Sequence, residues 1–113
     1  MNNCIENYIE AWNSDDDKIR YEKLKSSFSI TGRYVDQHIK SEIQNIDEMN
    51  LLIKNFREKF KHKLILLKPP EVHNSIFRFN WKLEFEESIL SRGTFFGKLN
   101  KLNLIEFIGG FTE

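Results

Sequence analysis

The sequence predicts a single α+β domain in which N-terminal helices pack on a curved, mainly antiparallel sheet. Helical spacing of apolar residues dominates the first half of the 113-residue chain, and alternation of apolar and polar residues dominates the second half. Glycines recur at alternate positions of a later strand pattern, where they allow a sheet to bend. The length also fits one domain, since domains commonly have about 100–150 residues.

Three helices are expected before the long strands. The stretch 13–17 breaks the first helix and supplies N-caps for a short second one, and Asp47 is the expected N-cap of the third. The expected inward-facing residues are Ile5, Tyr8, Ile9 and Trp12, then Tyr21, Leu24 and Phe28, then Met49, Leu52, Ile53, Phe56 and Phe60.

The strands are expected mainly in the second half. Thr31 and Gly32 are expected to turn the chain into a short extended piece at 33–37, followed by a polar loop at 38–46. A strand at 64–67 ends at two prolines, and strict alternation over 77–86 is typical of a half-buried antiparallel strand. Two further strands are expected at 89–101 and 104–111.

Composition excludes several function classes. The 17 basic and 17 acidic residues balance, so no net field favours nucleic acid or an anionic membrane as a partner. The longest apolar run, 64–67, is too short to cross a bilayer, and the first thirty residues do not resemble a signal peptide. One cysteine, Cys4, cannot form an internal disulfide, so a cytoplasmic protein is expected. Three scattered histidines give no metal-ligand spacing, and we expect no metal.

Asp36 is the first candidate for chemistry because it ends an apolar strand ahead of the curved sheet. If its side chain points into an apolar hollow, burial raises its pKa and suits it to act as a general base. The alternative is an aspartate that caps a turn or pairs with Arg33. His38, two residues further, either assists acid–base chemistry or lies in solvent, and His62 and His73 are expected to be exposed.

The order of these segments resembles the nuclear transport factor 2-like superfamily, and within it the SnoaL-like polyketide cyclases and ketosteroid isomerase-like proteins. The resemblance rests on segments 8–13, 32–36, 77–81, 93–96 and 104–111 and covers nearly all of a single domain, 1–113. It implies a cystatin-like α+β roll, shaped as a cone with a pocket at its mouth, and frequent homodimers. It implies no cofactor.

The resemblance also implies roles for particular residues. Asp36 matches the general base of the isomerase branch, and Tyr8 matches the tyrosine that donates to a developing oxyanion. Phe95 stands where those relatives carry a second acid, and a phenyl ring cannot donate a hydrogen bond. The expected pocket lining is Trp12, Tyr34, Phe56, Phe77, Phe79, Trp81, Phe95 and Phe107.

Two function classes follow. The first is a small-molecule-binding protein that performs cofactor-free isomerase, cyclase or dehydratase chemistry on an apolar carbonyl compound. The alternative is a non-catalytic module that binds a ligand or a partner protein, which Phe95 favours. Phe96, among polar neighbours, is a candidate anchor for a subunit contact.

Overall fold

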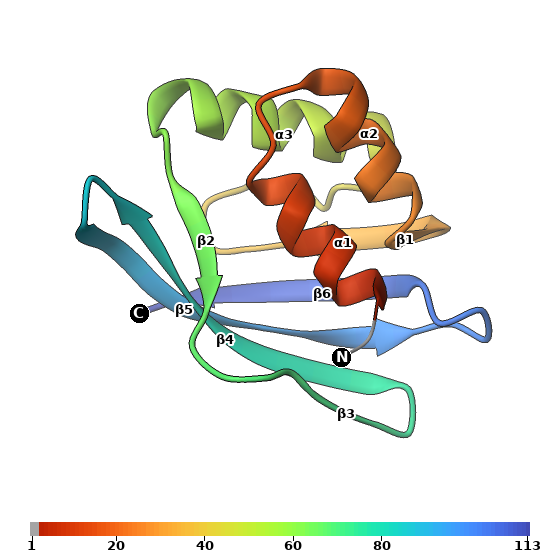
Figure 1. Ribbon diagram of the computed structural model, residues 1–113. Coiled ribbons are helices and arrows are strands. Elements are labelled where there is room, and N and C mark those ends of the chain that lie inside the picture. The colour runs from red at the N-terminus through yellow and green to blue at the C-terminus, as the bar shows by residue number, and fades with distance from the viewer. Residues whose placement is uncertain (1–2) are drawn as a thin grey trace.

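Three helices lie over one face of a curved six-stranded sheet in the computed structural model, which describes residues 3–113 (Figure 1). The helices are α1 (Asn3–Trp12), α2 (Asp17–Lys25) and α3 (Ile46–Lys59). The strands are β1 (Phe28–Val35), β2 (Lys63–Leu66), β3 (Glu71–His73), β4 (Ile76–Phe85), β5 (Ser88–Leu99) and β6 (Ile105–Thr112). The predicted α+β class with a curved sheet is confirmed.

Two helices, α2 and α3, begin at residues whose side chains cap the helix N-terminus. Asp16 is the N-cap of α2 and accepts a hydrogen bond from the backbone N–H of Ile19 at 2.9 Å. Asn45, not Asp47, is the N-cap of α3 and accepts from the N–H of Glu48 at 2.8 Å. The Glu48 carboxylate accepts in turn from the Asn45 side chain at 2.8 Å, so this reciprocal pair selects Asn45 and leaves Asp47 in the first turn.

The strand order is β1-β6-β5-β4-β2, with β3 pairing to β4. All neighbours are antiparallel except β1 and β6, which run parallel. The long hairpin of β4 and β5 continues into β6, and these strands curve beneath the helices (Figure 1). The mainly antiparallel sheet is therefore as expected, although the parallel pair was not foreseen.

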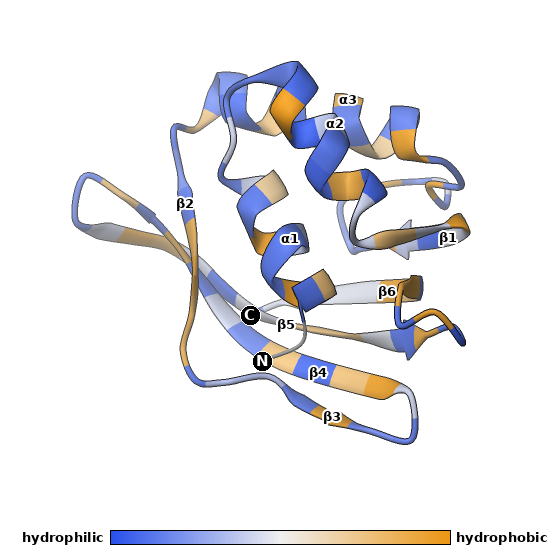
Figure 2. Cartoon of the chain, turned by 45° about the vertical axis from the view of Figure 1, so that its right-hand side comes forward, coloured by the Kyte–Doolittle hydropathy of each residue, from blue (hydrophilic) through white to orange (hydrophobic). Residues whose placement is uncertain are grey.

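The core lies between the helices and the concave face of the sheet. Strand β4 alternates between hydrophobic and hydrophilic residues along its length (Figure 2). Its residues Phe77, Phe79, Trp81 and Leu83 are buried, and the α1 residues Ile5 and Tyr8 are buried against the same core. This alternation places a row of aromatic rings under the first helix.

Several sequence-based boundaries are corrected by the structure. Phe28 begins β1 instead of ending the second helix, because α2 stops at Lys25 and Phe28 pairs with Ile105 of β6. Gly32 lies inside β1, at a register shift between Phe28 and Arg33, and is not a turn before it. The short strand β3, which follows the two prolines, was not predicted.

Helices able to cross a membrane are absent from the described part of the chain: none combines the necessary length with sufficient apolar character.

Candidate functional site

A cavity of about 340 Å³ opens at one end of the concave face, between α1, α3 and the sheet. Most of its wall is apolar, and its polar groups come from the ends of β1 and β6 and the start of β5. The lining residues are Trp12, Tyr34, Asp36, His38, Phe56, Phe60, Leu64, Trp81, Leu83, Leu90, Ser91, Phe95, Gly110 and Thr112. A mostly apolar cavity with a few polar groups is the usual form of a small-molecule site.

Asp36 lies in the cavity wall directly after β1 and is half-buried. Its Oδ2 accepts a hydrogen bond from the Tyr34 hydroxyl at 2.5 Å, and its Oδ1 accepts from the backbone N–H of His38 at 2.7 Å. The second contact is the turn-capping arrangement that the sequence left open as an alternative. Arg33 forms its ion pair with Glu42, at 3.6 Å, and not with Asp36. Asp36 therefore caps a turn and also lines the cavity.

Tyr34 is the phenol that reaches Asp36. Its side chain is almost fully buried, and removal from water raises its pKa well above the usual 10.0, with further increases from Tyr8 and Asp36. The hydroxyl therefore stays protonated and donates to the carboxylate. Residues 34 and 36 lie on the same face of an extended chain, because side chains alternate with a period of two.

Two glycines of the sheet, Gly93 and Gly110, leave space for the rings of Trp81 and Phe95 to pack closely against the backbone. A Cβ on Gly93 would lie 2.3 Å from the Trp81 ring, and a Cβ on Gly110 would lie 2.6 Å from the Phe95 ring. The same Gly110 Cβ would come within 3.6 Å of the Asp36 Cβ. Both positions are therefore too crowded for a side chain, and the absence of a Cβ at Gly110 leaves room for the Phe95 ring.

Phe95 is the centre of the aromatic cluster. Its ring centroid lies 5.5 Å from those of Tyr8, Phe79 and Trp81, and 6.1 Å from that of Tyr34. Phe95 lines the cavity, whereas Tyr8, which packs against the rings of Phe95 and Trp12, does not. Phe95 is therefore a packing residue that also lines the cavity.

Tyr8 is fully buried in this cluster. Burial raises the pKa of its hydroxyl well above 10.0, the nearby Trp12 side chain lowers it, and Asp36 raises it. No hydrogen bond of acceptable geometry reaches the hydroxyl from the described residues, and the indole N–H groups of Trp12 and Trp81 are buried without a partner as well. Three unpaired polar groups in one cluster are unusual, since buried polar groups are normally hydrogen-bonded.

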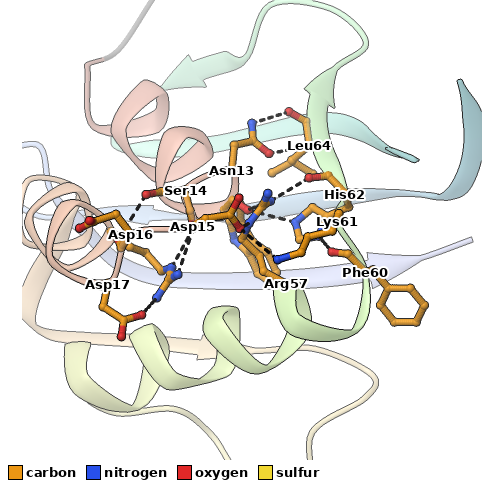
Figure 3. A network of polar contacts seen from close by, with 12 residues as sticks. Asn13, Ser14, Asp15, Asp16, Asp17, Arg57, Phe60, Lys61, His62 and Leu64 are labelled. Carbon is orange, nitrogen blue, oxygen red and sulfur yellow. Dashed lines mark hydrogen bonds and ion pairs between the residues drawn. The ribbon is translucent and has the colours of Figure 1, made fainter. Parts of the chain in front are cut away.

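A polar network behind the cavity holds the end of α1 against α3 and β2 (Figure 3). Arg57 is buried and donates to the Trp12 carbonyl at 3.0 Å, to the His62 carbonyl at 2.7 Å and to Asp15 Oδ1 at 2.6 Å. The Asn13 side chain donates to the Leu64 carbonyl at 3.0 Å and accepts from its N–H at 2.6 Å. These bonds fix the segments that carry Trp12 and Leu64, two cavity residues.

His62 was expected to be exposed, but only 2% of its surface is accessible. Its ring packs between Trp12 and Phe56, with centroids 6.0 and 4.9 Å away. Its Nδ1 lies 3.1 Å from the Phe60 carbonyl and its Nε2 lies 3.0 Å from the Trp12 carbonyl. Burial is the main cause that lowers the pKa of His62 below its usual 6.5, which favours the neutral ring.

The structure brings together only part of the predicted site. Trp12, Tyr34, Phe56, Trp81 and Phe95 line the cavity with Asp36. Phe79 does not, because it is buried in the core, and Phe77 does not, because it lies toward the opposite end of β4, beside β3. His38 lines the cavity, whereas His73 is exposed on β3.

Phe107, predicted as pocket lining, lies on the convex face of the sheet. A register shift on β5 pairs Leu99 with Ile105 and the adjacent Lys98 with Phe107, so alternation on β6 is broken. Phe107 therefore shares its face with Phe96, at a centroid distance of 6.0 Å. This correction removes one ring from the predicted pocket.

Other cavity residues were not predicted as site residues. Leu83 and Ser91 continue the inward rows of Phe79–Trp81 and Gly93–Phe95, so alternation alone could have identified them. Leu90 and Phe60 lie at the exposed end of the cavity; Phe60 belongs to the expected inward stripe of the third helix, whereas no sequence signal marks Leu90.

The comparison with known proteins identifies this architecture. No family model matches the sequence, and no curated protein sequence matches it. Among solved structures, an isomerase candidate of the SnoaL-like family from Agrobacterium tumefaciens superposes with a TM-score of 0.88 at 25% identity, covering 97% of this chain and 94% of that chain. The chain has the nuclear transport factor 2-like fold.

Two further solved structures share the nuclear transport factor 2-like fold. A ketosteroid isomerase candidate from Kribbella flavida has a TM-score of 0.77 at 11% identity, covering 99% of this chain and 76% of that chain. A nuclear transport factor 2-like protein of unknown function from Exiguobacterium has a TM-score of 0.74 at 16% identity, covering 97% and 98%. The predicted nuclear transport factor 2-like fold is thus confirmed, and at these identities the likeness concerns the fold alone.

Proposed function

We propose that the cavity binds a small apolar molecule and that Asp36 acts on it as a general base, in carbonyl chemistry that needs no cofactor. The observation that carries this proposal is the single carboxylate in an otherwise mostly apolar wall, oriented by the Tyr34 hydroxyl. A base held by one buried donor is positioned for proton abstraction next to a carbonyl group. The similar SnoaL-like chain from Agrobacterium tumefaciens, named as an isomerase candidate, supports this direction.

Tyr34, and not Tyr8, is the proposed partner of the base. The Tyr8 hydroxyl lies behind Phe95 and does not line the cavity, whereas Tyr34 lines it and contacts Asp36. Tyr8 therefore keeps the predicted role of oxyanion donor only if the Phe95 ring moves aside. In the proposal, Tyr34 orients the base and remains protonated.

A direct test uses 2-tetralone, a bicyclic ketone with acidic protons beside its carbonyl. In D₂O, proton NMR measures how fast those protons exchange with and without the protein. A general base contributes about 10²–10⁴-fold, so the proposal expects acceleration that Asp36→Asn abolishes and that Asp47→Asn, a change at an exposed aspartate of α3, retains. Equal acceleration by the wild-type protein and Asp36→Asn would overturn the role of Asp36.

Non-catalytic ligand binding is the second candidate function, and one observation favours it. Phe95 supplies a phenyl ring to the cavity wall and Tyr8 does not line the cavity, so neither residue offers a hydrogen-bond donor there. Under this alternative, 2-tetralone binds without faster exchange. Measuring both its dissociation constant and its exchange rate separates the two candidates.

Assembly into a homodimer in the cytoplasm is also a proposal. Phe96, Phe107 and Phe111 form an outer aromatic patch on the convex face, with Phe96 41% and Phe111 59% exposed. A contiguous apolar patch of this kind is typical of a protein contact. Sedimentation velocity tests it: a dimer that Phe96→Glu dissociates supports the proposal, and a monomeric wild-type protein contradicts it.

A further inference from the structure

The charge of the cavity wall is carried by one side chain. Asp36 is the only Asp, Glu, Lys or Arg residue among the lining residues. Several basic residues are next to lining residues in the sequence but do not line the cavity themselves: Lys59, Lys61, Lys63, Lys82 and Arg92. Lys61 lies 4.0 Å from Asp15, on the side of the polar network. A ligand in the cavity therefore meets one carboxylate and no Lys or Arg at the wall, and the other ionisable side chain there is the His38 imidazole.

The Asp36 carboxylate has acceptor capacity left over. An ionised carboxylate offers about four lone-pair sites, and the structure shows two donors, the Tyr34 hydroxyl and the His38 backbone N–H. Both donors are uncharged, and Asp36 forms no ion pair with any residue between 3 and 113. The two hydrogen bonds therefore orient the Asp36 carboxylate, and no cationic side chain neutralises its charge.

Aromatic residues make up six of the thirteen other lining residues, and one of them, Tyr34, is hydrogen-bonded to Asp36. The ring centroid of Tyr34 lies 6.4 Å from that of Trp12 and 6.1 Å from that of Phe95. The ring centroid of Trp81 lies 5.5 Å from that of Phe95. Faces of tryptophan, tyrosine and phenylalanine attract cations through the ring quadrupole. A carboxylate beside several rings is therefore complementary to a positive group on an apolar body.

We propose that the ligand of this cavity is an apolar amine, whose ring or chain fills the aromatic interior while its ammonium group donates to Asp36. The inference rests on the ligand-binding part of the proposed function and is independent of its catalytic part. An anionic group at the same place would face an unneutralised carboxylate and be repelled. A neutral alcohol would gain a hydrogen bond without the charge.

Three compounds with one ring system test the inference: 2-aminotetralin, 2-tetralol and tetralin-2-carboxylate, which at pH 7 are cationic, neutral and anionic. Trp12 and Trp81 are the two tryptophans of the chain and both line the cavity, so their fluorescence reports binding, with calorimetry as a check. A charge-assisted hydrogen bond adds about tenfold or more in affinity. The amine should therefore bind about tenfold more tightly than the alcohol, and the carboxylate most weakly.

The variants locate the effect at Asp36. Asp36→Asn should bring the amine close to the alcohol while leaving the alcohol unchanged, and Asp47→Asn should keep the wild-type ranking. Added salt should weaken binding of the amine more than that of the alcohol, which tests the charge in the wild-type protein even if Asp36→Asn does not fold.

Other outcomes overturn distinct statements. An alcohol that binds as tightly as the amine would refute the amine inference and leave the proposed function standing. Failure of all three compounds, and of 2-tetralone, would refute ligand binding itself. A preference for the amine that survives Asp36→Asn would show that another group selects the cation.

Discussion

The Tyr34 hydroxyl donates to Asp36 Oδ2 at 2.5 Å, and this bond joins a buried ring to the one charged group of the cavity wall. Hydrogen bonds to charged groups contribute about 1.5–3 kcal/mol. The pair therefore both orients the carboxylate and ties the end of β1 to the interior of the fold.

Tyr34→Phe should lower the free energy of unfolding by about 1–3 kcal/mol, because it removes the donor and keeps the ring. Urea denaturation measures the change. Tyr21→Phe, at a half-buried position of α2 away from the cavity, is the matched control and should change stability much less. If the two variants are equally stable, the bond to Asp36 contributes nothing to the folded state.

Alkaline pH should destabilise the protein through its buried tyrosines. The folded-state pKa values of Tyr8 and Tyr34 are raised above 10.0, so the unfolded chain loses these protons first as pH rises. Stability is thus complete below pH 10 and falls above it. Absorbance at 295 nm, followed together with circular dichroism, should show part of the phenolate signal appearing only as the fold is lost. Early appearance of the full signal in the folded protein would contradict the burial of both rings.

Mild acid should destabilise the protein through His62. Its folded-state pKa is lowered below 6.5, so the unfolded chain takes up the proton first as pH falls. Stability is complete above pH 6.5 and is lost as pH falls toward the folded-state pKa. Urea denaturation between pH 7 and 5 should show the loss, and His73→Gln, at an exposed residue of β3, should retain it. His62→Gln should be less stable at pH 7 but should vary less over this range.

Arg57→Met should lower the free energy of unfolding by about 2–5 kcal/mol, because it leaves the buried carbonyls of Trp12 and His62 without their donor. Urea denaturation measures the loss, and Arg92→Met, at an exposed residue of β5, is the control. Ligand affinity should fall with stability, since Arg57 fixes the segment that carries Trp12. An Arg57→Met protein as stable as Arg92→Met would exclude this role.

Phe95→Ala should cost about 3–5 kcal/mol, the range for removing a buried phenyl ring. It should also remove the ring that separates the Tyr8 hydroxyl from the cavity. Phe111→Ala, on the exposed convex face, should cost far less. The distinctive readout is the exchange rate of 2-tetralone: an increase relative to wild type would show that Tyr8 becomes available as a donor.

Local patterns predicted much of this molecule. The period of two on β4 placed Phe77, Phe79 and Trp81 on one buried face, and Tyr34 and Asp36, both expected at the pocket, line the cavity. Features that depend on long-range pairing were missed. Phe107 changed faces because of a register shift between β5 and β6, and His62 is buried against Trp12, which is distant in sequence and supplies one of its two carbonyl partners.

The position of Tyr8 illustrates the same limit. Its place on the inward face of α1 follows from helical spacing, and its burial agrees with that. That Phe95 screens it from the cavity depends on how β5 pairs with β4 and lies under α1. A family resemblance could align Tyr8 with a donor, but only the packed structure separates it from the place where a ligand would lie.

The bonds between Asn13 and Leu64 also have a consequence for the behaviour of the protein in a crowded solution. Strand β2 ends the row of paired strands, and an open strand edge can recruit a strand from another molecule. The Asn13 amide occupies both the N–H and the carbonyl of Leu64, as a neighbouring peptide would. At the other end of the row, Ile43 bonds in both directions with Tyr34. The Asn13 side chain and Ile43 thus occupy backbone hydrogen-bonding groups of the two edge strands, β2 and β1, where pairing with a strand of another molecule and fibre growth would begin.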